Sequence, residues 1–181
     1  MSEPAYFRNT CAETALRIYH NRRPSYTYAI EHVTPLLFMT AAHESGGFRF
    51  RRQQGRRYPL RDYIGAYGLV QMERATVEWM LDYLHAREAM LDRVLCALEE
   101  WGDYDSRDLV LDKSANLICK ALEDPSADAL GVILMRLRYF PDPHPIPGDL
   151  DGQAEYAKRV YNTHLGAAKP EDYANAYRRL W

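Results

Sequence analysis

The chain has 181 residues, with 47% hydrophobic residues, 27% charged residues and a formal net charge of −2 at pH 7. This length fits one domain with a substantial core and disfavours two full domains. The composition is typical of a soluble globular protein. Because the net charge is slightly negative, it gives no general attraction to nucleic acid, and any basic binding surface must be local.

The cysteines and the start of the chain exclude several further classes. Cys11, Cys96 and Cys119 form neither a CxxC pair nor an even set, which argues against a disulfide framework or a zinc site, and we expect all three to be reduced and buried. The N-terminal residues have no apolar signal-peptide core, and no stretch reaches the roughly 18 apolar residues of a membrane span. We therefore expect a protein made in the cytoplasm without a signal peptide or a membrane span.

Helical periodicity dominates the chain and predicts a mainly α fold. Apolar residues recur at three- and four-residue spacing in segments 12–19, 77–101, 114–122, 127–140, 153–161 and 171–181. Thr34-Pro35 and Pro125-Ser126 are helix-start signals, while Gly46, Gly102 and Gly166 are expected stops. Segment 49–68 breaks the pattern and predicts an irregular loop or short β-hairpin, and segment 141–152, with its four prolines, predicts an extended surface connection.

The run PLLFMTAAHES, residues 35–45, is apolar nearly all round, which is typical of a central, buried helix. Glu44 lies in its last turn, and Gly46 and Gly47 can reverse the chain. The helix dipole at a C-terminus and apolar neighbours both disfavour a negative charge there. A carboxyl group that keeps its proton suits general acid catalysis. The same position also fits a glutamate that points into water at a frayed helix end.

Three short motifs occur along the chain, and Glu44-Ser45 is the first of them. Glu44-Ser45 closes the buried helix, GLVQM occupies residues 68–72 and VYN occupies residues 160–162. On these motifs the chain resembles the lytic transglycosylases and goose-type lysozymes, whose motifs are Glu-Ser, Gly-Leu-Met-Gln with an apolar residue, and Ala-Tyr-Asn. The resemblance covers residues 34–166, and the chain also resembles a phage-encoded version of this group. It implies one lysozyme-like domain of transglycosylase SLT type over residues 1–181.

The chain departs from the family motifs in three places. Val70 and Val160 stand where the family has Met and Ala, and Gly166 lies farther from the Tyr-Asn pair than usual. These changes leave Glu44 and Gln71 better matched than the third motif.

The resemblance implies a lytic transglycosylase that cleaves the β-1,4 bond between N-acetylmuramic acid and N-acetylglucosamine in peptidoglycan. Glu44 is then the single catalytic acid and base, and Gln71 and Tyr161 bind the N-acetyl group or a sugar hydroxyl. Ser45 and Asn162 hold Glu44 or the substrate in place. No metal or cofactor is needed. To reach the wall, such an enzyme would depend on a virion, a secretion apparatus or a holin.

Other functions stay open. A hydrolytic lysozyme of the same fold would use Asp62 or Glu73 to place a water, because ordinary glycosidases use two carboxyl groups. A virion structural or cell-wall-binding protein could retain the fold with a degenerate site. The arginine loop, residues 49–61, suits the carboxylates of peptidoglycan or the phosphates of nucleic acid, although the net charge makes nucleic acid the weakest candidate. Its arginines in the run RFRRQQGRR are Arg49, Arg51, Arg52, Arg56 and Arg57.

Overall fold

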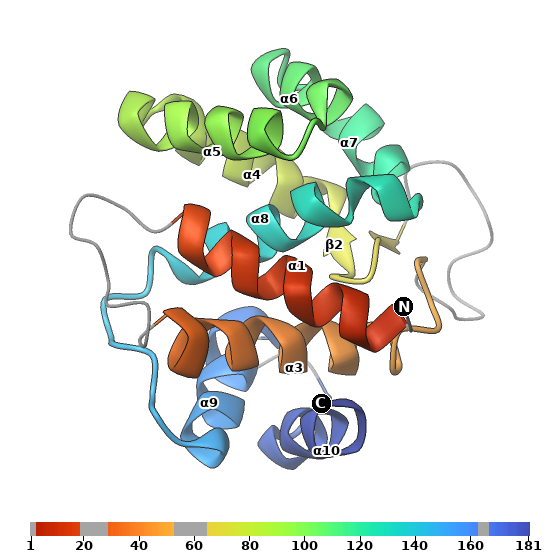
Figure 1. Ribbon diagram of the computed structural model, residues 1–181, viewed down its shortest axis with the longest axis vertical. Coiled ribbons are helices and arrows are strands. Elements are labelled where there is room, and N and C mark those ends of the chain that lie inside the picture. The colour runs from red at the N-terminus through yellow and green to blue at the C-terminus, as the bar shows by residue number, and fades with distance from the viewer. Residues whose placement is uncertain (1–2, 19–28, 53–64, 163–166) are drawn as a thin grey trace.

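A computed structural model describes residues 3–18, 29–52, 65–162 and 167–181 (Figure 1). The predicted mainly α fold is confirmed. The α-helices are α1 (Glu3–Arg17), α3 (Thr34–Glu44), α4 (Arg74–His85), α5 (Glu88–Glu100), α6 (Tyr104–Leu111), α7 (Ala115–Ala121), α8 (Asp128–Tyr139), α9 (Leu150–Ala157) and α10 (Pro170–Leu180). Two π-helices, η1 (Ala29–Val33) and η3 (Lys158–Asn162), a 3-10 turn, η2 (Pro125–Ala127), and two short strands, β1 (Ala66–Tyr67) and β2 (Met72–Glu73), complete the described elements.

Helix α3 lies in the middle of the fold, as its apolar sequence predicts. It begins at Thr34 with Pro35 in its first turn, and its residues are buried from Leu36 through Ala42. Helix α1 lies along one side of it, and α9 and α10 pack against it from the other (Figure 1). Burial on several sides explains why the helix has no polar stripe. Its last residue, Glu44, therefore lies at the end of a buried helix.

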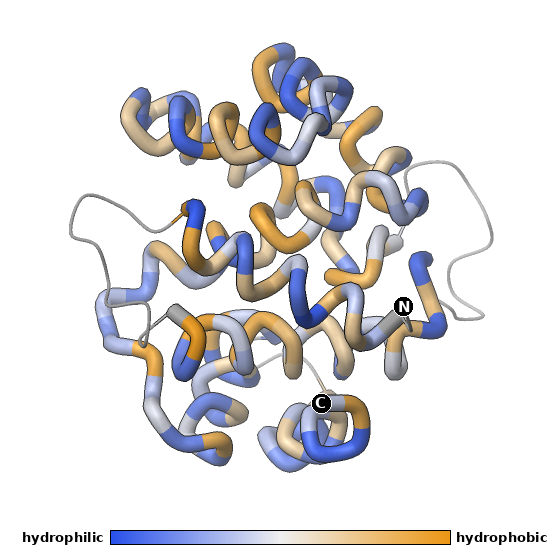
Figure 2. Tube along the Cα trace, viewed as in Figure 1, coloured by the Kyte–Doolittle hydropathy of each residue, from blue (hydrophilic) through white to orange (hydrophobic). Residues whose placement is uncertain are grey.

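Helix α8 links the two ends of the molecule. It is buried along most of its length and contacts α1, α3, α4 and α5. Helices α4 to α7 form a layer at one end of the fold, and α9 and α10 lie at the other (Figure 1). The outer helices α5 and α10 alternate between hydrophilic and hydrophobic residues, as helices with one face in solvent do (Figure 2).

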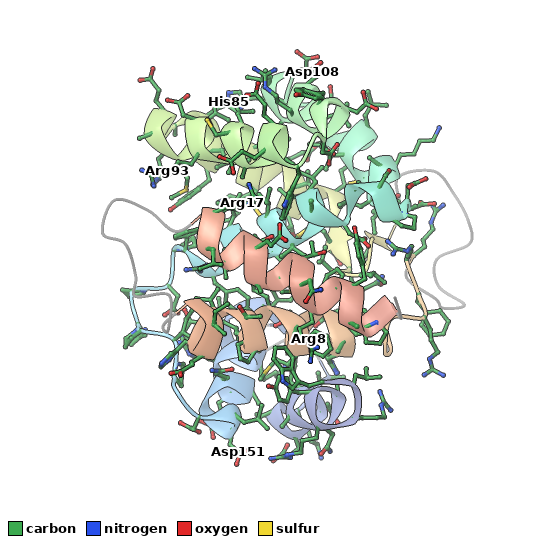
Figure 3. All side chains as sticks on the ribbon, in the orientation of Figure 1. Arg8, Arg17, His85, Arg93, Asp108 and Asp151 are labelled. Atoms are coloured by element: carbon green, nitrogen blue, oxygen red, sulfur yellow. The ribbon has the colours of Figure 1, made fainter. Side chains whose placement is uncertain are left out.

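The two chain ends that the structure describes lie together. Arg8 of α1 donates a hydrogen bond to the backbone oxygen of Trp181 at 3.2 Å, and its guanidinium lies 5.2 Å from the centre of the indole (Figure 3). The Trp181 ring also packs edge-on against Phe38 of α3, with ring centres 5.0 Å apart. These contacts hold the end of α10 against α1 and α3.

The two strands lie on either side of GLVQ in the second motif, whereas the sequence predicted a loop or hairpin before this motif. β1 and β2 pair antiparallel, with Ala66 opposite Glu73 and Tyr67 opposite Met72. The expected loop or hairpin at 49–68 thus overlaps the strand pair only at its end, and residues 53–64 lie outside the described part of the chain. The turn that carries GLVQ is the connection between the strands.

Two helices differ from the sequence expectation. The continuous periodic segment 77–101 is divided between α4 and α5, with Ala86 and Arg87 in the break. Neither residue is a glycine or proline, so the pattern contains no sign of the turn. Helix α6 was not expected from the pattern, although Asp103 caps it by accepting a hydrogen bond from the Ser106 N–H at 3.1 Å.

The glycine stops and the cysteines can also be compared with expectation. Gly46 and Gly102 follow the ends of α3 and α5 with φ values of 63° and 72°, as predicted, whereas Gly166 lies outside the described residues. Cys11 and Cys119 are free and buried, but the expectation for Cys96 is wrong, because its side chain is exposed on α5. Across the described residues, none of the helices combines the length and the apolar character that a membrane crossing requires.

Candidate functional site

The turn after α3 fixes the direction of the chain at Glu44. The Ser45 hydroxyl donates to the Ala41 carbonyl and accepts from the Phe48 N–H, both at 2.7 Å. Its side chain has no exposed surface, and the contact with a substrate expected for Ser45 stays a prediction. In this structure Ser45 stabilises the turn that ends the helix, and it can hold Glu44 in place only through the backbone.

A cleft of about 400 Å³ opens beside this turn, and Glu44 lines it. It brings Glu44 and Gln71 together, although a long stretch of chain separates them. The residues that line it are His43, Glu44, Gly46, Phe50, Ala66, Gln71 and Glu73. A larger hollow of about 480 Å³ lies beside Trp101, but no motif residue lines it. The first two motifs thus meet at one place on the surface.

Gln71 adopts a backbone conformation that is unusual for its residue type. Its φ is +46°, in the left-handed region, which costs a residue with a side chain about 1–2 kcal/mol. Its Nε2 atom donates to the Gly68 carbonyl at 2.8 Å and to the Phe50 carbonyl at 3.4 Å. The amide nitrogen is therefore directed to the backbone, which leaves the Oε1 atom as the acceptor for a ligand group in the cleft.

Three buried tyrosine hydroxyls lie near Glu44, and one of them contacts it. The hydroxyl of Tyr139 lies 2.7 Å from the hydroxyl of Thr40, that of Tyr161 donates to the Val70 carbonyl, and that of Tyr173 donates to Glu44 Oε1 at 2.7 Å. Burial is the main cause that raises the pKa of all three phenols, and the negative charge of Glu44 raises each one further. All three hydroxyls therefore keep their protons at neutral pH.

The third motif, residues 160–162, does not line the cleft but contacts residues next to those that do. Tyr161 and Asn162 lie in η3, and π-helical turns are frequent at functional sites. The Tyr161 hydroxyl was expected to face the substrate, but it is bound to the backbone of Val70. The side chain of Asn162 accepts from Lys158 Nζ at 3.2 Å and hydrogen-bonds with Tyr173. Neither side chain lines the cleft in this structure, and the substrate contacts expected of these two residues stay a prediction.

Tyr173 is the residue that the sequence did not identify. Its helical spacing indicated a core or interface role for both Tyr173 and Tyr177, and this is correct for both: Tyr173 is buried in the core, and Tyr177 packs 4.8 Å from the Trp181 ring. In addition, the Tyr173 hydroxyl reaches Glu44 across 129 positions of sequence. No local pattern could have revealed this pair, because their contact depends on how α10 packs on α3.

A second carboxyl group is available in the cleft. Glu73 is exposed there and stands at the start of α4, where its side chain makes no capping hydrogen bond. Asp62, the other candidate, lies outside the described residues. Within the described ranges, no three His, Cys, Asp or Glu side chains are close enough together to hold a metal ion.

The arginine loop is partly engaged in ion pairs within the protein. Arg51 binds both carboxylate oxygens of Asp128, at 2.6 and 3.0 Å, and Arg52 lies 3.5 Å from Glu123. Arg56 and Arg57 lie outside the described residues. Asp128 thus already occupies the two N–H groups of Arg51 that would bind a wall carboxylate or a phosphate, and the role of the rest of the loop stays open.

Comparison of the chain with protein-family models, with curated proteins and with solved structures gives no match. The geometry of the cleft and the chemistry of the groups that line it are therefore the basis on which a function can be inferred.

Proposed function

We propose that this protein is a lytic transglycosylase that cleaves the β-1,4 bond between N-acetylmuramic acid and N-acetylglucosamine in peptidoglycan. The observation that carries the proposal is the meeting of Glu44 and Gln71 in one cleft of about 400 Å³ at the end of a buried helix. Glu44 combines an open side toward the cleft with a tyrosine donor on its buried side. Such an arrangement suits a carboxyl group that gives and takes a proton in a fixed direction.

The reaction needs only one carboxyl group. Glu44 donates its proton to the glycosidic oxygen as the bond to C1 of N-acetylmuramic acid breaks, and the N-acetyl group of the substrate shields the positive charge that develops at C1. The Glu44 carboxylate then accepts the proton of the sugar's own 6-hydroxyl, whose oxygen bonds to C1. The product is a 1,6-anhydro sugar, and no water is consumed. Gln71 Oε1 is suited to accept the N–H of the N-acetyl group.

A hydrolytic lysozyme is the second candidate, because Glu73 lines the same cleft as Glu44. In that reaction Glu73 would take a proton from a water that attacks C1, while Glu44 protonates the leaving oxygen. The two reactions give products that differ in mass by one water.

A turbidity assay on purified cell walls, followed by mass spectrometry of the fragments, tests both proposals. Glu44→Gln has nearly the same shape but cannot donate a proton, so we expect a loss of about 10²–10⁴-fold in cleavage rate with an unchanged melting temperature. Glu73→Gln is the matched control and should retain most of the activity of a transglycosylase. An equally large loss in Glu73→Gln, with hydrated products, would support the hydrolase.

A third outcome would favour a different class of function. If the folded wild-type protein leaves walls intact from mildly acidic to mildly alkaline pH, the enzymatic proposal fails. A cell-wall-binding or virion structural role would then be the better account, and co-sedimentation with the same walls would detect it.

A further inference from the structure

A directed series of hydrogen bonds ends at Glu44. Lys158 carries only donors, so its 3.2 Å bond to Asn162 fixes the amide oxygen of Asn162 as the acceptor. The NH₂ group of Asn162 is thereby left as the donor in its hydrogen bond with Tyr173. Tyr173 in turn donates to Glu44 Oε1 at 2.7 Å. Every bond in the series therefore points from the Lys158 ammonium group toward the Glu44 carboxyl.

The Tyr173 hydroxyl is held in this position by packing. The ring has no exposed surface, and the His43 ring lies against it with centres 4.1 Å apart and planes inclined by 37°. Helix α10, which carries Tyr173, packs along α3, which carries Glu44. Because both side chains come from packed helices, the hydroxyl cannot turn to water without moving an element of the core.

The other two tyrosines near Glu44 donate elsewhere. Thr40 gives its own proton to the Leu36 carbonyl at 2.7 Å, so the hydrogen bond between Thr40 and Tyr139 must use the proton of Tyr139. Tyr161 gives its proton to the Val70 carbonyl. Of these three tyrosines, Tyr173 is thus the one that donates to Glu44.

We propose that Tyr173 is a positioning residue that fixes Glu44 Oε1 as an acceptor and leaves Oε2 as the oxygen that gives and takes the catalytic proton. A carboxyl oxygen that already accepts a buried hydrogen bond is a poor site for its own proton, so the proton of the neutral form resides on Oε2. In the ionised form the same bond is charge-assisted and becomes stronger. The catalytic part of this role rests on the proposed function, whereas the hydrogen bond can be tested without substrate.

The experiment titrates Glu44 in the free protein. The protein is isotope-labelled at its glutamate side-chain carboxyl carbons, and the Glu44 resonance is assigned by its loss in Glu44→Gln. Tyr173→Phe removes the one donor oxygen, so we expect the titration midpoint of Glu44 to move to higher pH by about one unit. The alkaline limb of the wall-cleavage rate should move by the same amount, with kcat about tenfold lower and KM little changed.

Tyr177→Phe is the matched control, because it makes the same change one turn further along α10, where the ring packs against Trp181. It should leave both the titration and the pH–rate profile unchanged. If Tyr173→Phe fails to fold, Asn162→Ala serves as the second variant, since it removes the donor to Tyr173 and should move the midpoint in the same direction by less.

The outcomes separate this inference from the proposed function. A midpoint that moves in Tyr173→Phe but not in Tyr177→Phe supports the positioning role of Tyr173, even if wild-type protein cleaves no wall; in that case the proposed function alone fails. An unchanged midpoint in a folded Tyr173→Phe protein overturns the inference, even if wall cleavage is robust. With Tyr173→Phe unfolded, an unchanged midpoint in Asn162→Ala does the same.

Discussion

Breaking the ion pair between Arg51 and Asp128 should destabilise the fold more than breaking any other ion pair of the arginine loop described here. Arg51 makes two parallel hydrogen bonds to Asp128, whose side chain is only 4% exposed and lies in the first turn of α8. The pair joins the segment that follows Glu44 to the helix that runs through the core. In Arg51→Met the Asp128 carboxylate would stay buried beside the Cys11 thiol, whose pKa is raised by burial and by the charge of Asp128.

The expected magnitude follows from the burial of the two partners. Removing one member of a fully buried ion pair costs about 3–5 kcal/mol. Arg51 retains 19% exposure, and the N-terminus of α8 favours a negative charge at Asp128, so we expect a smaller loss of about 2–3 kcal/mol in the free energy of unfolding. For a chain of this size, that loss lowers the melting temperature by about 4–12 °C.

Thermal and denaturant unfolding of Arg51→Met and Asp128→Asn measure this effect, and the double variant gives the coupling between them. Arg52→Met is the control from the neighbouring position, because its 3.5 Å pair with the half-exposed Glu123 should be worth less than about 1 kcal/mol. Equal stability of Arg51→Met and wild type, combined with weaker binding to cell walls, would refute this reasoning and return Arg51 to the substrate-binding role that the sequence predicted.

Two further predictions concern groups outside the cleft. Tyr161→Phe removes the buried bond to the Val70 carbonyl, so thermal unfolding should show a loss of about 1 kcal/mol, and wall cleavage should fall less than in Tyr173→Phe; unchanged stability with a large loss of cleavage would place the Tyr161 hydroxyl at the substrate. The hydrogen bond from Arg159 is the main cause that lowers the pKa of Asp142 to about 2, so Asp142 contributes stability above its unfolded pKa of about 3.9 that is lost as the pH falls through about 2. Asp142→Asn should therefore melt about 2–4 °C below wild type at neutral pH, and a difference that persists undiminished at pH values near 2 would contradict this linkage.

Local signals located the helix that carries Glu44, but not all of its surroundings. Pro35 at the start and Gly46 after the end bracket α3, and both act within one turn of the residues they affect. Uniform apolar character then indicated burial. The same kind of local reasoning failed at Ala86 and Arg87, where the chain turns without a glycine or proline because α5 packs back on α4. Tertiary contacts determine where such a break falls, and the spacing of apolar residues along the helix carries no information about them.

The arginine loop shows a different limit. A run of arginines without an acid among them suggested a binding surface, because the partner of each charge was sought within the same segment. Asp128, the actual partner of Arg51, lies 77 positions away at the start of α8. The partner of Arg51 could therefore not be found within the loop itself. Long-range pairing of this kind can be recognised only once the packing of the helices is known.

The backbone of Gln71, which lines the cleft, is unusual for a residue with a side chain, and this favours a functional role over simple packing. Gln71 occupies the left-handed region, where a glycine would fit at less cost, and the strain is held in place by bonds to the Gly68 and Phe50 carbonyls. The π-helical turn η3 places the hydroxyl of Tyr161 on the carbonyl of Val70, next to Gln71 in the chain. Gln71 and Glu44 both line the same cleft. A turn that served only to connect β1 and β2 would need neither the glutamine side chain nor its strained backbone.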